Sequence, residues 1–404
     1  MDLGGWNFVS AIEVSQVNAA LVAQRDALIQ SFSIKTPIVA SGHYTDWRVV
    51  PGGSGKILVM EIGVSDGDIE TKSGSASLAG TIITLQIRLD LLPAPGGGQQ
   101  ITFDLSTVTL QGVRNLPSGL GEITGAELGD IIAKDLARHA DQVTFVLAQI
   151  SPLAKGAPAW LAANAPDFAY LEPQGGQASI AIFANPNAGP TPALKLDPGV
   201  VGPNGFGLAI SSRLFMDNVF RPALIVALGL PGNLPVSETA NGNFSFNGEA
   251  DLRSVSAAGE SYTPKLTSLS AALIDDRVTI TFAGHCDMGM DISMDFNGSS
   301  SVALSMSQPG TLAFSSIGPS SFDKDVHIPW YDHLLDIVAG VAEIILQVTV
   351  AAISSELSGG IRDVAGATAL LSQAPNVVGW FGKGGFMVDQ AGLAGVLWLH
   401  GKHN

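Results

Sequence analysis

A long alternation of apolar and polar residues over 277–298 constrains the fold more than any other feature of the sequence. The apolar residues of one parity are Val278, Ile280, Phe282, Cys286, Met288, Met290, Ile292, Met294 and Phe296. Because successive side chains of a β-strand point to opposite faces, the run predicts one apolar and one polar face. It is far longer than the usual strand of about 5–6 residues, so we expect Gly284 to bend it or divide it into two strands. Such a face has to be covered, either by the protein alone or also by an apolar ligand.

The composition places a large apolar surplus in a chain with little charge. Of its 404 residues 46% are hydrophobic and only 14% are charged, against about 25% charged in an ordinary globular chain. No stretch fits a membrane span, because Glu343 and Gln347 interrupt the best candidate over 337–353. The first residues carry no basic region and no apolar signal core. We therefore expect a soluble protein that is made in the cytoplasm, with release by a non-classical route left open.

The formal net charge of −16 limits the partners of the chain. A strongly acidic protein repels phosphate backbones, so nucleic-acid binding is excluded, and membrane contact is expected to be peripheral at most. The single cysteine, Cys286, cannot form an internal disulfide, which fits a cytosolic protein.

Hydrophobic periodicity predicts the same order of elements in both halves of the chain. In the first half we expect a helix over 10–31 capped by Ser10 and Glu13, strands over 36–113, a helix over 124–150 capped by Thr124 and Glu127, a short helix over 157–163 and strands over 168–183. In the second half we expect a helix over 208–228 kinked at Pro222, strands over 243–316, helices over 330–357 and 361–371, and strands over 377–399.

This repeated order predicts an α+β protein of two similar modules. We place the first module at 1–190, a Pro/Gly-rich link at 191–205 and the second module at 206–404. The helix over 330–357 is apolar on most of its circumference, which indicates burial on most sides. A strongly curved antiparallel sheet wrapped around it would provide that burial.

Two segments resemble a known family. Gly5-Trp6-Asn7-Phe8-Val9-Ser10-Ala11-Ile12, followed by Val17-Asn18-Ala19-Ala20-Leu21, is similar to the start of the clostridial P-forty-seven proteins. Residues 208–216, followed by Pro222, resemble the central segment of that family. The family is assigned to the tubular lipid-binding (TULIP) superfamily, so the resemblance implies modules in which a highly curved antiparallel sheet wraps a long helix.

The resemblance also implies a function, which is the binding and possible transfer of lipid in an apolar groove between sheet and helix. The groove candidates are Met288, Met290, Ile292, Met294, Phe296, Ile337, Val341, Ile345, Val348, Val17 and Leu21. An open alternative is a non-enzymatic accessory or scaffold subunit of a bacterial toxin complex, whose groove is filled by its own side chains and whose partners are other toxin-cluster proteins. No cofactor is expected in either case.

The sequence contains only weak candidates for a site of chemistry. The segment 52–56, Gly-Gly-Ser-Gly-Lys, is similar to part of a phosphate-binding loop, but Ile57 stands where Ser or Thr is required, so we predict a turn leading into a strand. In a strand His285 and Asp287 face away from Cys286, so these three cannot share a metal ion. No Ser-His-Asp set can be assembled, and we expect no enzymatic activity.

Overall fold

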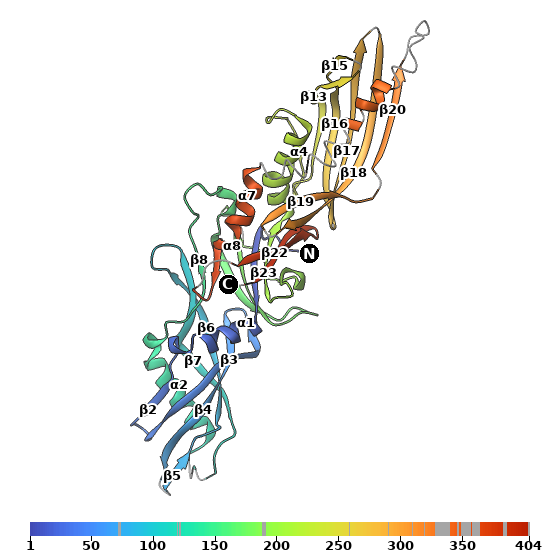
Figure 1. Cartoon of the computed structure of the whole chain (residues 1–404). Helices are drawn as coiled ribbons and strands as arrows, with labels where there is room; N and C mark the ends of the chain where they lie inside the picture. Colours follow the sequence, from blue (N-terminus) through green and yellow to red (C-terminus); the bar gives the residue numbers. More distant parts are fainter. Residues whose placement is uncertain are drawn as a thin grey trace.

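The structure is a computed structural model of the α+β class, elongated and built mainly of antiparallel sheets (Figure 1). It describes residues 1–71, 74–118, 120, 123–187, 191–257, 259–289, 291–308, 310–318, 320–327, 340–345, 347–348, 357, 364–382 and 386–402. The three larger sheets follow one another along its length, and we call the parts around the two outer ones the first lobe and the second lobe. Among the described residues, no helix combines the length and the apolarity needed to cross a bilayer.

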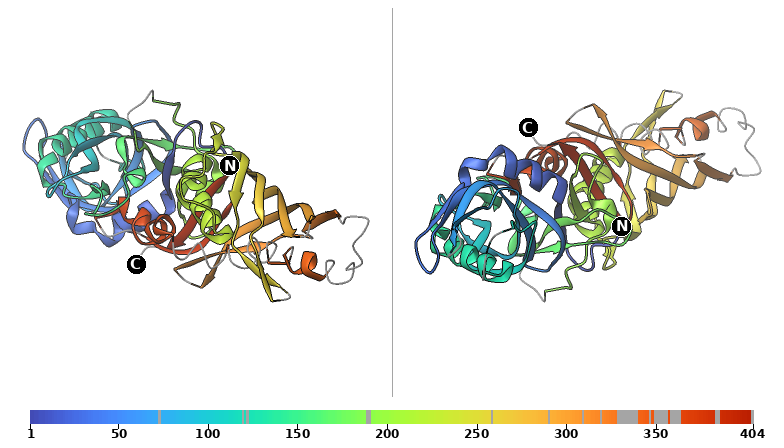
Figure 2. Two further views of the ribbon diagram at one scale, coloured as in Figure 1. Left: turned by 90° about the horizontal axis from the view of Figure 1, so that it is seen from above. Right: turned by 90° about the horizontal axis from the view of Figure 1, so that it is seen from below.

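The first lobe consists of one curved sheet and two helices. Its strands, in spatial order, are β2 (Ser31–Ile34), β3 (Ala40–Ser54), β4 (Ile57–Thr71), β6 (Ile82–Pro93), β7 (Gln99–Arg114), β8 (Val146–Ile150) and β21 (Val378–Trp380), with β5 (Gly74–Ser77) beside β4. Views from above and below show this sheet curling into a half-barrel (Figure 2). Helix α1 (Val14–Ala23) contacts β3, and α2 (Gly125–Arg138) lies against β7.

The central sheet joins the two halves of the chain. Its spatial order is β22 (Met387–Leu393), β23 (Val396–Lys402), β11 (Phe206–Ser211), β1 (Phe8–Glu13), β10 (Ser179–Asn185) and β9 (Asn164–Leu171). Strands β1 and β11 pair antiparallel in its middle, with Phe8 opposite Ile210. One face packs on the main core, and Trp6, Phe183 and Val200 belong to a second, smaller core that includes the predicted link. Both faces of this sheet are therefore buried.

The second lobe is formed by the other large sheet and the helices that follow β11. Its strands, in spatial order, are β12 (Ser237–Glu238), β13 (Phe244–Asp251), β16 (Lys265–Ile274), β17 (Arg277–Gly289), β18 (Ile292–Gln308) and β19 (Thr311–Ser316), with β20 (Ser321–His327) also on β18. A small hairpin, β14 (Val255–Ala257) and β15 (Glu260–Tyr262), stands apart. Phe215 and Phe220 pack on Phe314 of β19, and these contacts hold the helices that follow β11 against this sheet.

The long alternation over 277–298 is a hairpin, but its turn does not lie at Gly284. Strand β17 ends at Gly289 and β18 begins at Ile292, with Asp291 in the left-handed conformation between them. Gly284 lies inside β17, where an added Cβ would come within 2.2 Å of Phe296 Cζ and 2.5 Å of the Lys265 carbonyl oxygen. The aromatic ring that lies over this position thus requires a glycine, and the chain divides into two strands between Gly289 and Ile292 rather than at Gly284.

Two expected helices are partly strands, and a third is reduced to one turn. The helix expected over 10–31 begins only at Val14, so the cap formed by Ser10 and Glu13 is wrong, and Ser10 lies inside β1, where its hydroxyl accepts a hydrogen bond from Trp380 Nε1 at 3.2 Å. The helix expected over 124–150 ends at Arg138, and 146–150 is strand β8; its cap by Thr124 and Glu127 is confirmed. The short helix expected over 157–163 is a single 3-10 turn, Ala159–Leu161.

The helix expected over 208–228 also starts as a strand. After β11, the chain forms α3 (Ser212–Phe215), a π-helical turn (Met216–Phe220) and α4 (Arg221–Leu228). Pro222 lies in the first turn of α4, where its missing N–H is tolerated, and the expected irregularity is the π-helical turn before it.

Much of the predicted helix over 330–357 lies outside the described residues, although 340–345, 347–348 and 357 are helical. The helix expected over 361–371 is observed as α7 (Ala365–Ser372), and its first residues, 361–363, are not described. A short helix, α8 (Ala374–Val377), then leads into β21.

Candidate apolar ligand site

The β17–β18 hairpin turns its apolar side chains toward the interior of the second lobe. Ile292, Met294 and Phe296 are at most 2% exposed, and Met288 is partly buried against the same core. Met290 lies outside the described residues. The predicted apolar face therefore exists, and it is covered along most of its described length.

A helical segment packs against this core at the distal half of the sheet. Val341 and Ile345 are buried and Val348 is partly buried against the same core, whereas Ile337 lies outside the described residues. Glu343 accepts a hydrogen bond at 2.6 Å from Lys324 of β20. That bond, followed by one from Gln347, lowers the pKa of the Glu343 carboxyl. This exposed ion pair connects the segment to β20 of the sheet.

The first-lobe candidates lie apart from those of the second lobe. Val17 and Leu21 are buried on α1, which is held to β3 by reciprocal hydrogen bonds between the side chain of Asn18 and the main chain of Val49, at 2.8 and 3.0 Å. Figure 1 places α1 beside β3 at the inner end of the first lobe, far from β17 and β18. The structure thus places the predicted residues on two separate apolar faces rather than in one groove.

A cavity of about 520 Å³ lies between the start of β19 and α7. Its walls combine apolar and hydroxyl side chains, and the lining residues are Gly310, Thr311, Leu312, Ala367, Thr368, Leu371 and Ser372. None of these residues is charged. Leu312 is buried on the same side of β19 as Phe314, so the cavity adjoins the apolar face of the sheet. We call this space the α7 cavity; its size falls within the range of about 300–1,000 Å³ that is typical of small-molecule sites.

The position of α7 is set by a close backbone contact. Gly366 lies against the π-helical turn, where an added Cβ would come within 2.0 Å of the Asn218 carbonyl oxygen. Leu370 of the same helix is fully buried, while Thr368 is exposed toward the cavity. The sequence predicted a helix here but gave no sign that its exposed face would border a cavity, because that depends on how close α7 lies to β19.

The first lobe contains buried polar groups that sequence reasoning missed. Tyr44 of β3 is fully buried, and its hydroxyl has no hydrogen-bond partner among the described residues. Burial, followed by the charge of Asp135, raises the pKa of the Tyr44 hydroxyl, and burial raises the pKa of the Asp135 carboxyl against the opposing effect of His139. Both groups are thus held neutral more readily than in water, and the hydroxyl is free to donate to a carbonyl oxygen.

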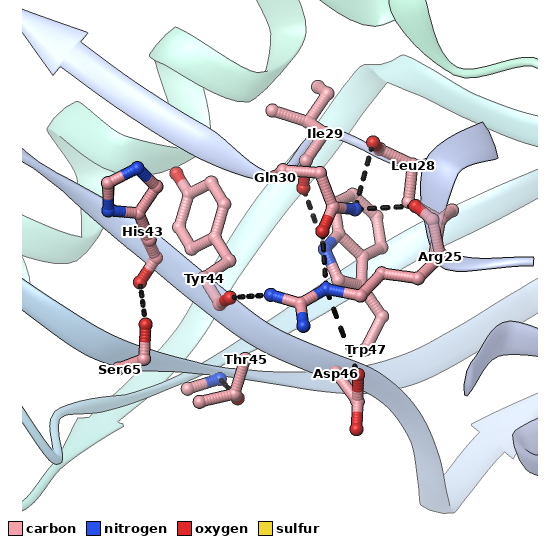
Figure 3. Close-up of polar contacts among 11 residues, drawn as sticks. Arg25, Leu28, Ile29, Gln30, His43, Tyr44, Thr45, Asp46, Trp47 and Ser65 are labelled. Carbon is pink, nitrogen blue, oxygen red and sulfur yellow. Dashed lines mark hydrogen bonds and ion pairs between the residues drawn. The ribbon is translucent and has the colours of Figure 1, made fainter.

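The backbone around Tyr44 is fixed by the loop that follows α1 (Figure 3). The Arg25 guanidinium donates to the Tyr44 carbonyl oxygen at 2.9 Å, and Trp47 Nε1 donates to the Ile29 carbonyl oxygen at 3.3 Å. Figure 3 shows the Tyr44 ring pointing away from the guanidinium. The loop therefore holds this part of β3 through the main chain of Tyr44 and the side chain of Trp47.

The polar face of the β17–β18 hairpin carries a small histidine cluster. Asp295 accepts hydrogen bonds from His285 Nδ1 at 2.9 Å and His327 Nε2 at 3.2 Å, and these bonds lower the pKa of its carboxyl. Cys286 lies on the opposite, buried face, and burial, then Asp287, raises the pKa of its thiol to about 11. In the part of the chain that the structure describes, no group of three or more His, Cys, Asp or Glu side chains has a metal-binding arrangement.

The segment 52–56 ends β3 and makes the tight turn into β4 at residues 55–56, with Ser54 paired to Ile57, so the predicted turn leading into a strand is present. Lys56 forms an ion pair with Asp167 at 3.0 Å and lies over the Phe168 ring. The lysine is therefore engaged in structural contacts with β9.

Solved structures with the same architecture exist. The chain matches "Structure of P47 from Clostridium botulinum A2" with a TM-score of 0.76 and 16% identity, covering 100% of this chain and 98% of that one. It matches "Crystal structure of P47 of Clostridium botulinum E1" with a TM-score of 0.76 and 15% identity over 100% of both chains. The structure of a lipopolysaccharide binding protein aligns with a TM-score of only 0.31, which supports no argument. No family profile and no curated protein matches the sequence. The chain therefore has the P47 fold over its full length, as the resemblance in the sequence implied.

Proposed function

We propose that the protein binds a lipid or another apolar small molecule, and that acyl chains enter through the α7 cavity onto the apolar face of the second-lobe sheet. The main observation in support of this proposal is the α7 cavity. It combines an apolar wall at Leu312 and Leu371 with hydroxyl groups in its lining, and it adjoins a continuous apolar interior. Each methylene removed from water contributes about 0.8 kcal/mol, so an acyl chain is held without a charged anchor.

The same proposal gives the other predicted groove residues a role. Met288, Met294 and Phe296 would contact the acyl chain after the helical segment 340–345 moves from the sheet, since methionine side chains adapt to irregular apolar partners. In this scheme each half of the chain is one lipid-binding module and the protein is not an enzyme. Transfer between membranes would require peripheral contact only, and the protein would be made in the cytoplasm, with release by a non-classical route left open.

The test is lipid uptake by variants of the α7 cavity. Thr368 lines the cavity and Ala365, on the same helix, is exposed and does not line it. Thr368→Trp should fill the cavity and reduce the uptake of a fluorescent phospholipid from vesicles by about tenfold, an effect of about 1.4 kcal/mol, whereas Ala365→Trp should leave uptake unchanged. Equal uptake by both variants and the parent would rule out the α7 cavity as the entrance.

A second function is supported by the dense packing of the predicted groove. Met294, Phe296 and Ile345 are covered by the protein's own side chains, as expected of an accessory subunit that uses the fold as a scaffold within a toxin complex. Native mass spectrometry with organic extraction separates the two functions. Lipid that co-purifies in a near-integral ratio supports the carrier, and an empty protein that takes up no lipid from vesicles supports the scaffold.

A further inference from the structure

Strand β13 has an edge that is only partly used. Strand β12 pairs with its first two residues, Ser237 opposite Ser245 and Glu238 opposite Phe244. The remainder of β13, residues 246–251, pairs with β16 on one edge. Among the described residues no strand lies on its other edge. The backbone groups along that edge are therefore available for a further strand.

The sequence before β12 explains why the pairing stops. The segment 229–236 approaches β12 from the end of α4 and contains Pro231 and Pro235, which have no N–H to donate to a sheet. Leu234 N instead donates to the Pro231 carbonyl oxygen at 3.1 Å, which closes a turn. The segment thus diverges from β13 at the point where a continued ladder would need its donors.

A groove of about 830 Å³ lies between this segment and β13. Its lining includes buried apolar side chains, which are Leu230, Leu234, Phe246 and Ala250. Its charged lining residues, which form the rim, are Glu249, Asp251 and Lys265, and Lys265 Nζ is already bonded to Glu249 at 3.2 Å. Two carboxylates against one ammonium leave the rim acidic.

We propose that this β13 groove binds an extended polypeptide segment of alternating apolar and basic residues, which adds to β13 as a strand and continues β12. In an added strand successive side chains point to opposite faces, so apolar residues would enter the groove while the residues between them reach Glu249 and Asp251. These two carboxylates lie two residues apart in β13, which matches the spacing of successive basic residues on one face of the partner.

The charge of the groove selects the occupant. Another copy of this chain carries a net charge of −16, so its approach to the acidic rim is unfavourable. A β-bulge between Asn247 and Ala250 also distorts the edge, which limits pairing to a short segment. We therefore expect a weak and reversible interaction with a basic partner and no self-association through β13.

The experiment measures the binding of a defined peptide to the full-length protein. The probe is a Lys/Val alternating peptide of six residues, the length of the free edge 246–251, with a Glu/Val peptide of the same length for comparison. The charge-reversed variant Glu249→Lys/Asp251→Lys should bind the Lys/Val peptide about tenfold more weakly and the Glu/Val peptide more tightly. Asp68 and Glu70 of β4 are exposed with the same spacing, so Asp68→Lys/Glu70→Lys is the matched control and should bind as the parent does.

Two further measurements test the strand addition itself. Hydrogen exchange should show slower exchange of the 246–251 amides when the Lys/Val peptide is bound. Two further peptides carry N-methyl groups on the odd-numbered or on the even-numbered residues, so that only one of them loses the N–H groups that face β13. That peptide should not bind, and the other should. Four results would each overturn the proposal. They are equal weakening of binding in both charge-reversed variants, binding of both N-methylated peptides, absence of peptide binding to the parent, and dimerisation of the parent through β13. Lipid uptake by the Glu249→Lys/Asp251→Lys variant should equal that of the parent, so this proposal stands or fails separately from lipid binding.

Discussion

The carboxylate of Asp295 is shared by two histidines from neighbouring strands of the second lobe, His285 on β17 and His327 on β20. Since its pKa is lowered from the ordinary value of 3.8, its contribution to stability is present above that value and is lost as the pH falls through the lower folded value. Lys265 and Asp325, the cross-strand neighbours of His285 and Asp295, also face the cluster from β16 and β20.

We predict that Asp295→Asn lowers the free energy of unfolding at neutral pH by at most about 1 kcal/mol, because the cluster is exposed and solvent weakens each contact. The difference from the parent should shrink in urea unfolding as the pH is lowered below 3.8. Asp325→Asn removes an exposed carboxylate of the neighbouring strand and serves as control. A difference that persists unchanged in acid would show that Asp295 stabilises the lobe by another means.

At the scale of elements, the docking of α7 depends on the contact between Gly366 and the Asn218 carbonyl oxygen. Gly366→Ala should displace α7 and destabilise the protein by about 1–3 kcal/mol, because an added methyl group meets rigid backbone. Gly340→Ala is the matched control, since this helical glycine has open space around its Cβ position and should be neutral or slightly stabilising. Thermal unfolding compares the two, and equal melting temperatures would refute the role assigned to Gly366.

Sequence periodicity predicted the strands that have one buried face and failed for those that have two. The alternations over 83–91 and 277–298 are strands, because one of their faces is exposed or polar. Strands β1 and β11 are buried on both faces of the central sheet, so they lack alternation and were predicted as helix continuous with α1 and α3. The apolar face that bears Met294 was predicted for the same reason, whereas the α7 cavity and the β13 groove depend on distances between elements that periodicity does not contain.

At the scale of the whole molecule, the halves of the chain complete each other's sheets. The central sheet takes β1, β9 and β10 from the first half and β11, β22 and β23 from the second. In addition, β21 from the second half pairs with β8 in the first lobe. Trp380 of β21 donates its buried indole hydrogen bond to Ser10 of β1.

We therefore predict that fragments 1–190 and 206–404, expressed separately, fold incompletely, because each lacks the partner strand that covers β1 or β11. Mixed in solution, they should associate and recover cooperative unfolding, as measured by circular dichroism and analytical ultracentrifugation. If the two fragments fold independently and do not associate, the pairing of β1 with β11 adds little to stability.

The strand order of the central sheet also determines when its strands can pair during biosynthesis. Strand β1 leaves the ribosome well before its neighbour β11, and the hairpin of β22 and β23 emerges later still. Until then β1 exposes an apolar edge, and such edges favour misassembly. The nascent chain therefore has a long interval in which a chaperone would improve the yield, and slow translation of its second half would extend that interval.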